Sequence, residues 1–301
     1  MGAISNRLIS GTWAAWYAAT EPVRLRWARQ KHGGDYDGLN DPRFHAPQKN
    51  ADGSFTIYGS SDPPINPLVT VYIPTHNRVD LLMERALPSV LAQTYRNIEI
   101  IVAAHGCTDG TASRVCGLGR PKTCVLGVPR RRTYPPTVEN HWFAKEVAPA
   151  NAALRAAGGA WIARLDDDDI WTPDHVEKLL RFAQKGDFEF VSAAYERERD
   201  GVREVVPHFG SDIIEAPYIG GHQTWLYRSY LRFMRYNQEC WRKRWNRVND
   251  TDLADRFWKA GVRIGWLDEV LAYVIPRPGE TTVGLEAYRR NAVNIERELA
   301  F

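Results

Sequence analysis

The chain has 301 residues, 44% of them hydrophobic and 25% charged, with a formal net charge of +3. This is ordinary for a globular protein with a sizeable core; the charge is too small to indicate a nucleic-acid partner, and no apolar stretch approaches the ~20 residues of a membrane-spanning helix. The four cysteines form no C-x-x-C pair, which argues against a zinc site or a disulfide framework and favours a reducing, cytoplasmic compartment.

The first 66 residues differ in amino-acid composition from the rest of the chain. Residues 1–31 hold five basic side chains against one acidic one, together with several aromatics, and residues 33–66 are rich in Gly, Pro, Asp and Asn. We expect residues 1–66 to form an N-terminal extension or linker and residues 67–301 to form one domain. Residues 1–31 have two interpretations: an amphipathic helix at a membrane interface, or an extra helix packed on the domain. Their many alanines favour packing.

From Val69 onward, short apolar runs alternate with helical patterns. The runs at 69–73, 98–104, 123–128, 160–165 and 188–195 predict strands, and the patterns at 80–93, 109–116, 148–159 and 172–186 predict helices, the first bent at Pro88. This alternation predicts an α/β fold with a mostly parallel sheet, whose ligands bind at the carboxyl ends of the strands. Three polar loops should therefore meet in one crevice. Their sequences are PTHNR (74–78), AHGCTDG (104–110) and LDDDD (165–169).

Four consecutive aspartates, 166–169, follow the predicted strand at 160–165. Two carboxylates ~4 Å apart repel by about 1 kcal/mol in water and by more inside a protein, so something positive should lie against them. A divalent cation is one explanation, because carboxylates are its usual ligands. The alternative is an acidic, solvated loop at the start of a helix, where carboxylates are favourable.

Four motifs in order resemble the family 2 glycosyltransferases of the GT-A fold, over about residues 67 to 280. They are the segment from Val69 to Val102, GCTDGTA (106–112), ANAALRAAGGAWIARLDDDDIWTPDHV (150–176) and NDTDLADRFWKAG (249–261). The resemblance implies a Rossmann-like GT-A domain, a nucleotide-sugar donor and a catalytic Mn²⁺ or Mg²⁺. Asp166 and Asp168 would bind the metal, and Asp169 would cap the next helix.

The same resemblance makes Asp250 the general base that takes a proton from the acceptor hydroxyl, in an inverting reaction. A well-placed base contributes about 10²–10⁴-fold to the rate. The alternative is that Asp250 or Asp252 only caps a helix. Asn249 stands where the family usually has Glu.

The nucleotide-sugar site implied by the resemblance departs from the family pattern. Ala104 and His105 replace a pair of aspartates, so uridine is not assumed as the base, and His105 either binds the base or is an ordinary loop histidine. The residues assigned to this site are Pro74, Thr75, His76, Asn77, Arg78, His105, Asn151 and Asp167.

The acceptor side is assigned from two further segments. GGHQTWLYR (220–228) resembles the family's acceptor segment, and ECWRKRWNR (239–247) interleaves aromatic and basic residues. The acceptor-side candidates are His222, Trp225, Trp241 and Asp252, with core packing as the alternative for Trp241. The run Arg130 to Arg132 either grips phosphate or is a solvated turn.

The sequence thus predicts a metal-dependent, inverting glycosyltransferase that moves a sugar to a glycan or glycolipid in surface polysaccharide synthesis. It would work in the cytoplasm or at the inner face of the membrane, with peripheral contact through residues 1–31. The alternatives are a nucleotidyltransferase, for which the glycine-rich loop is missing, and a non-catalytic sugar-nucleotide or glycan-binding module of the same fold.

Overall fold

The computed structural model describes residues 15–16, 19–28, 48–49, 55–56, 66–130, 134–208, 218–240 and 248–299. Residues 15–16 and 19–28 are helical, and Leu25 packs against the main core. β1 (Gln48–Lys49) and β2 (Phe55–Thr56) form a small antiparallel pair. In these ranges, none of the helices has the length and hydropathy needed to cross a bilayer.

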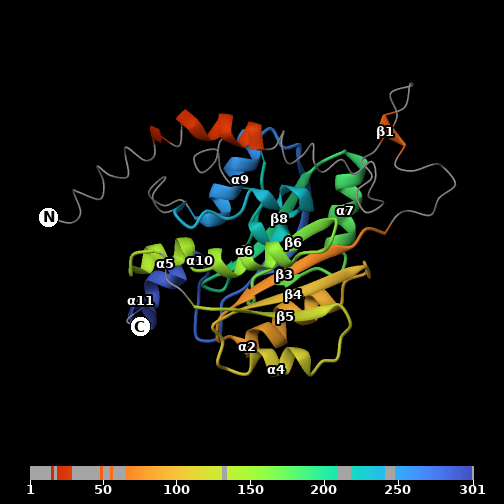
Figure 1. Ribbon diagram of the computed structural model, residues 1–301. Helices are drawn as coiled ribbons and strands as arrows, with labels where there is room; N and C mark the ends of the chain where they lie inside the picture. Colours follow the sequence, from red (N-terminus) through yellow and green to blue (C-terminus); the bar gives the residue numbers. More distant parts are fainter. Residues whose placement is uncertain are drawn as a thin grey trace.

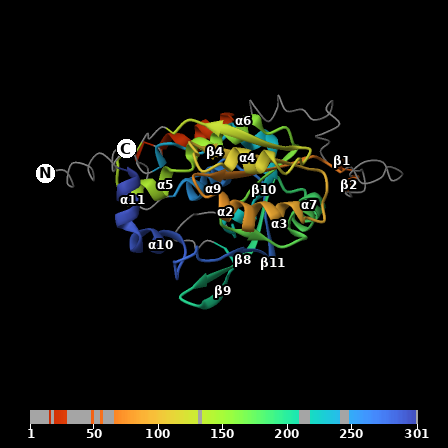
Figure 2. The ribbon, with the colours of Figure 1, turned by 90° about the horizontal axis from the view of Figure 1, so that it is seen from below.

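A nine-stranded sheet forms the centre of the molecule (Figure 1). Its order is β5-β4-β3-β6-β10-β8-β11-β7, and β9 pairs with β8 at a free edge, in a hairpin that projects from the body (Figure 2). The strands are β3 (Val69–Thr75), β4 (Ile98–His105), β5 (Thr123–Val128), β6 (Trp161–Arg164), β7 (Ile170–Trp171), β8 (Phe190–Arg199), β9 (Val202–Val206), β10 (Leu226–Arg228) and β11 (Ile264–Val274).

The predicted parallel arrangement holds for one half of this sheet. The pairs β3–β4, β4–β5 and β3–β6 are parallel, whereas β10 lies antiparallel to both β6 and β8, so the other half is mixed. Because side chains alternate across a strand, Val71 and Ile73 enter one core cluster while Tyr72 enters the other. The sheet therefore separates two hydrophobic cores.

Helices cover both faces of the sheet. Figure 1 shows α6 on one side of the parallel strands, and α2 and α4 on the other. The helices are α2 (Val79–Leu81), the π-helix η1 (Leu82–Ala86), α3 (Leu87–Leu91), α4 (Thr111–Cys116), α5 (Val138–Ala144), α6 (Val147–Ala156), α7 (His175–Lys185), η2 (His222–Thr224), η3 (Ser229–Phe233), α9 (Asn249–Lys259), α10 (Gly284–Arg290) and α11 (Ala292–Leu299).

The first helical pattern contains an irregular turn where Pro88 was expected to bend it. The helix passes from α2 through the π-helical turn η1 into α3. Pro88 has no N–H to donate to the carbonyl of Glu84 one turn earlier, so the regular α-helical bonding cannot continue there. This turn carries Arg85 toward the loops that follow β6 and β11.

Candidate functional site

Two cavities adjoin one another at the carboxyl ends of β3, β4 and β6. The first, of about 560 Å³, is lined mainly by the loops after β3 and β4 and by α5 and α10. The second, of about 530 Å³, is lined by the aspartate loop, β8, η2 and the start of α9. Three cationic side chains line both cavities: Arg78, Lys145 and Arg277.

The first cavity gathers most of the residues predicted to bind the nucleotide sugar. Its lining includes Pro74, Thr75, His76, Asn77, Arg78, His105 and Asp167. Asn151 is not among them: it is buried on α6, and its amide donates to the carbonyl of Tyr236 and accepts from that residue's N–H. Asn151 therefore holds the chain at Tyr236 in place.

Two histidines form one wall of the first cavity. The Nδ1–H of His76 donates to the backbone carbonyl of His105 at 2.6 Å, and the two rings meet edge to face. Burial, with the nearby His76 and Arg130, lowers the pKa of His105 to about 4, so its ring is neutral at pH 7. Among the described residues its Nε2 has no hydrogen-bond partner, although it is buried. A neutral imidazole in this position can offer a ligand one donor or one acceptor.

No pattern in the sequence indicated the opposite wall of this cavity. It is formed by Tyr134, His141, Tyr288, Asn291 and Ile295. His141 is hydrogen-bonded to the hydroxyl of Tyr134, and Trp142 packs edge-on against Tyr288 at 4.7 Å between ring centroids. Helices α10 and α11 thus fold back over α5. Of the predicted arginine run, Arg130 lines the cavity and residues 131–132 lie outside the described residues.

Positively charged side chains lie against three of the four aspartates and offset their negative charge. Arg78 lies 3.1 Å from Asp167 and 3.6 Å from Asp168, and Arg277 lies 3.8 Å from Asp168. Asp167 also accepts a hydrogen bond from Thr75 at 2.7 Å. Even so, burial beside Asp168 raises the pKa of Asp167 to about 6.

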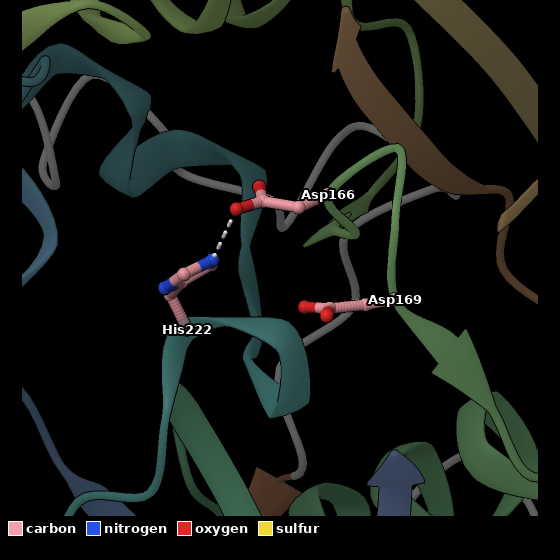
Figure 3. A group of neighbouring side chains, drawn as sticks. All are labelled: Asp166, Asp169 and His222. Carbon is pink, nitrogen blue, oxygen red and sulfur yellow. Dashed lines mark hydrogen bonds and ion pairs between the residues drawn. The ribbon is translucent and has the colours of Figure 1, made fainter. Parts of the chain in front are cut away.

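Asp166 is held between Arg164 and His222. Arg164 donates to its Oδ1 from Nε at 3.0 Å, and the Nε2 of His222 lies 3.0 Å from its Oδ2 (Figure 3). The Nδ1 of the same imidazole lies 2.8 Å from the Oδ2 of Asp250 on α9. Both ring nitrogens donate only in the imidazolium form. Burial opposes this charge, but Asp166 raises the pKa of His222 well above its usual value.

Asp250 occupies the first turn of α9 and lines the second cavity. Its Oδ1 accepts a hydrogen bond from the N–H of Thr251 at 2.7 Å, and its Oδ2 accepts one from His222. Burial alone would raise the pKa of Asp250, but the hydrogen bond and charge of His222 lower it. Asp250 is therefore an ionised, oriented carboxylate. The neighbouring Asn249 donates to the carbonyl of Phe143 and so fixes α9 against α5.

Asp169 differs from the other three aspartates. Among the described residues, no cation or hydrogen-bond donor contacts its buried carboxylate, and burial next to Asp168 and Asp166 raises its pKa well above the usual value. Ligand atoms of Asp166, Asp169 and His222 lie within 4.8 Å of one another. Figure 3 shows the three side chains grouped together. Once the Nε2 proton of His222 has been displaced, two carboxylates and an imidazole form a donor set that can hold a divalent cation such as Mn²⁺. The geometry thus brings Asp169 and His222 to Asp166. Asp168, the other predicted ligand, lines the same cavity and pairs with Arg78 and Arg277.

The acceptor-side candidates do not all line a cavity in the structure. His222 lines the second cavity, with Tyr195, Arg197 and Gly221 nearby in its wall. Trp225 and Asp252 line neither cavity: Trp225 is fully buried and donates to the carbonyl of Gly220, and Asp252 is paired with Arg256 at 2.9 Å. Trp241 lies outside the described residues.

Comparison with known proteins identifies the family. Residues 70–132 and 146–254, more than half of the chain, match the model of glycosyl transferase family 2. The chain therefore belongs to this family, and the predicted family is confirmed. Asp166, Asp169, His222 and Asp250 all lie in the matched residues.

Curated relatives of the chain are bacterial glycosyltransferases. The putative colanic acid biosynthesis glycosyl transferase WcaA of Escherichia coli K12 is 34% identical over 122 residues, which cover 40% of this chain and 39% of WcaA. The glucosyltransferase WfgD of E. coli, named for transfer from UDP-Glc to GlcNAc-diphosphoundecaprenol, is 30% identical over 130 residues, 43% of this chain and 46% of WfgD. An uncharacterised glycosyltransferase of Rickettsia felis is 31% identical over 132 residues, 43% of this chain and 19% of the relative. The matches thus span less than half of each relative.

Solved structures confirm the predicted fold. The chain superposes on Staphylococcus aureus TarS 1–349 in complex with UDP-GlcNAc with a TM-score of 0.53, at 18% identity over 77% of this chain and 65% of TarS. It superposes on the mannosyltransferase PcManGT of Pyrobaculum calidifontis, in complex with GDP-Man and Mn²⁺, with a TM-score of 0.51, at 18% identity over 98% of this chain and 75% of PcManGT. The fold is GT-A.

Proposed function

We propose that this glycosyltransferase is a metal-dependent, inverting enzyme that transfers a sugar from a nucleotide-sugar donor to a hydroxyl of a glycan or lipid-linked acceptor. The observation that carries the proposal is the sharing of Arg78, Lys145 and Arg277 between the two cavities. A nucleoside in the first cavity and a sugar in the second would leave the diphosphate between them, against these three cations. The acceptor class is supported by the lipid-linked substrate in the name of WfgD.

In this arrangement Asp250 accepts the proton of the attacking hydroxyl, because its ionised carboxylate lines the cavity that would hold sugar and acceptor. His222 orients Asp250 through Nδ1. Arg78 and Arg277 stabilise the negative charge that develops on the leaving diphosphate. Attack from the side opposite the leaving group inverts the anomeric centre.

Asp166, Asp169 and His222 are the residues that would hold Mn²⁺, or Mg²⁺ with more water ligands. When bound, the ion supplies positive charge against the diphosphate and polarises its bond to the sugar. Asp169 is suited to this role because a bound cation would offset the cost of burying its negative charge next to three other carboxylates. Asp168 instead fixes Arg78 and Arg277.

The test is a donor panel of UDP-, GDP- and dTDP-sugars, assayed for hydrolysis and for transfer to glycan acceptors, with and without Mn²⁺. We expect turnover with one nucleotide class, its loss on chelation and its recovery with Mn²⁺. A donor that stabilises the protein without being turned over would favour the non-catalytic module. At a hundredfold excess over Kd such binding adds about 2.7 kcal/mol of stability, enough to detect as a shift in Tm.

A further inference from the structure

The helical residues near the N-terminus expose an apolar stripe. Trp16, Val23 and Trp27 are 45%, 71% and 63% exposed. Their spacing, with Thr20 between them, repeats every three or four residues, so they lie along one face of a helix. Thr20 donates to the carbonyl of Trp16 one turn earlier, as helical threonines often do. We call this face the tryptophan stripe.

The opposite face of the same helix is already used in packing. Leu25 lies half a turn away from Val23 and Trp27, and it packs against the core cluster that contains Leu253 and Phe257 of α9. In Figure 1 the helix (red) lies along the top of the molecule, beyond α9. Packing on the domain and an exposed aromatic surface are therefore two faces of one helix, not alternatives.

Arginines flank the tryptophan stripe on both sides. Arg24 and Arg26 are exposed, and the guanidinium of Arg24 lies 5.4 Å from the centroid of the Trp16 ring. The single acidic residue of the described helix, Glu21, is partly buried and lies on the packed side. In the sequence, residues 1–31 carry five basic side chains against one acidic one. The exposed face is thus apolar and aromatic at its centre and cationic at its borders.

We propose that the tryptophan stripe docks on the surface of an anionic lipid membrane and lays the helix in the interface. Tryptophan and arginine suit this position because each buries an apolar body while its polar end stays hydrated. Cationic flanks attract acidic headgroups, which contribute on the order of fivefold in affinity per arginine near the surface. The proposal goes beyond sugar transfer and is independent of the donor and acceptor.

A second copy of the chain fits this face less well. A symmetric contact between two stripes would bring Arg24 and Arg26 of one copy against the same arginines of the other, and like charges repel. Three exposed side chains also offer much less than the ~800 Å² per partner of a stable protein interface. A membrane needs no such area, because a short amphipathic helix with a basic border binds by itself.

The test is flotation of the full chain with vesicles of phosphatidylcholine alone or of an equimolar mixture with phosphatidylglycerol. We expect binding to the mixed vesicles only, weakened by salt. The double variant Trp16→Ser/Trp27→Ser should lose binding, and Arg24→Gln/Arg26→Gln should weaken it about 25-fold, which is the fivefold effect taken twice. The matched control is Trp258→Ser, which removes a tryptophan that is 39% exposed on α9; its binding should be unchanged.

Three results would overturn the proposal: no binding to either vesicle, equal binding by the tryptophan double variant, or equal binding to both lipid compositions. The parent could instead fail to bind vesicles while the tryptophan double variant has a lower molecular mass in solution than the parent. That result would mean that the stripe binds a second copy of the chain. The altered side chains are exposed, so Tm and donor hydrolysis without vesicles should match the parent. If the parent protein hydrolyses the donor but does not float with vesicles, the membrane proposal is wrong and the proposed enzymatic function stands.

Discussion

His222 and Asp250 are joined by a 2.8 Å hydrogen bond between the imidazole Nδ1 and the carboxylate Oδ2. The other imidazole nitrogen reaches Asp166, so one side chain ties the aspartate loop to the first turn of α9. The proposed general base and the candidate metal site are therefore positioned by the same residue. Any change in His222 should affect both.

Replacing Asp250 by Asn should leave donor binding intact and lower transfer by about 10²–10⁴-fold, because the amide keeps the shape of the carboxylate but cannot accept a proton. The measurements are kcat for transfer and the donor-induced shift in Tm. The matched control is Asp255→Asn, which alters a buried carboxylate of the same helix that is paired with Lys259 and lines neither cavity. If Asp250→Asn turns over as fast as the parent, Asp250 is not the general base.

Replacing His222 by Phe should lower both catalysis and stability. The ring remains, but Asp166 and Asp250 each lose a donor, and leaving buried acceptors without partners costs about 1–3 kcal/mol. Denaturant unfolding at pH 7 measures the loss of stability, and Mn²⁺ titration measures the loss of metal affinity. Unchanged Mn²⁺ affinity in this variant would show that His222 is not a ligand and only orients Asp250.

Sequence periodicity was sufficient for the parallel half of the sheet, because buried strands and glycine-terminated helices have local signals. It could not place β10 between β6 and β8, since the order of strands depends on long-range pairing. In the site, motif position led to Asp166 and Asp168 as metal ligands, and both line the second cavity. The motif carried no signal that Asp168 pairs with Arg78 and Arg277, because these contacts depend on the fold. The wall formed by Tyr288 had no local signal, because it depends on α10 folding back over α5.

Arg85 should control donor affinity without touching the donor. Its guanidinium donates to the carbonyls of Asp168, Ile275 and Pro276 at 2.9–3.2 Å, so it joins the aspartate loop to the segment that carries Arg277. Arg85→Lys cannot form all three bonds, and the loss should cost about 1–3 kcal/mol of stability. We expect the donor KM to rise more than kcat falls. The control is Arg181→Lys on the exposed face of α7; equal kinetics in both variants would contradict a positioning role for Arg85.

Gly159 is required by the close approach of the chain before β6 to β3. A Cβ at this position would lie 2.6 Å from the backbone nitrogen of Thr70 and 2.8 Å from the carbonyl oxygen of Leu68. Backbone atoms cannot move aside without breaking the ladder, so Gly159→Ala should destabilise the protein by about 1–3 kcal/mol or more. At Gly127 on β5 a Cβ meets nothing within 4 Å. In urea unfolding, the midpoint of Gly159→Ala should therefore be lower than that of the parent, while the midpoint of Gly127→Ala should be nearly unchanged. Similar midpoints for the two variants would contradict the close approach at Gly159.

Two buried histidines should each make the protein less stable as the pH is lowered below about 6.5, because burial resists their protonation. Burial lowers the pKa of His175 to about 3, and likewise that of His141 to about 3. Between pH 6.5 and 3 these two histidines are therefore protonated in the unfolded chain but not in the folded chain, so their contribution to the free energy of unfolding decreases with decreasing pH. Asp167 and Asp169, whose pKa values are raised, act in the opposite direction. Each such histidine contributes up to about 1.4 kcal/mol per pH unit.

His175 offers a clean measurement of this effect, because it lies in the core away from both cavities. Its ring stacks on Trp171 with 4.0 Å between centroids, and its Nδ1–H donates to the carbonyl of Leu271. His175→Phe keeps a stacked ring but cannot titrate. We expect lower stability at pH 7.5, from the lost hydrogen bond, and a dependence on pH between 6.5 and 5 that is shallower by about 1.4 kcal/mol per unit. Urea unfolding at several pH values measures both, and a slope equal to the parent's would mean that the folded protein protonates His175 as readily as the unfolded chain does.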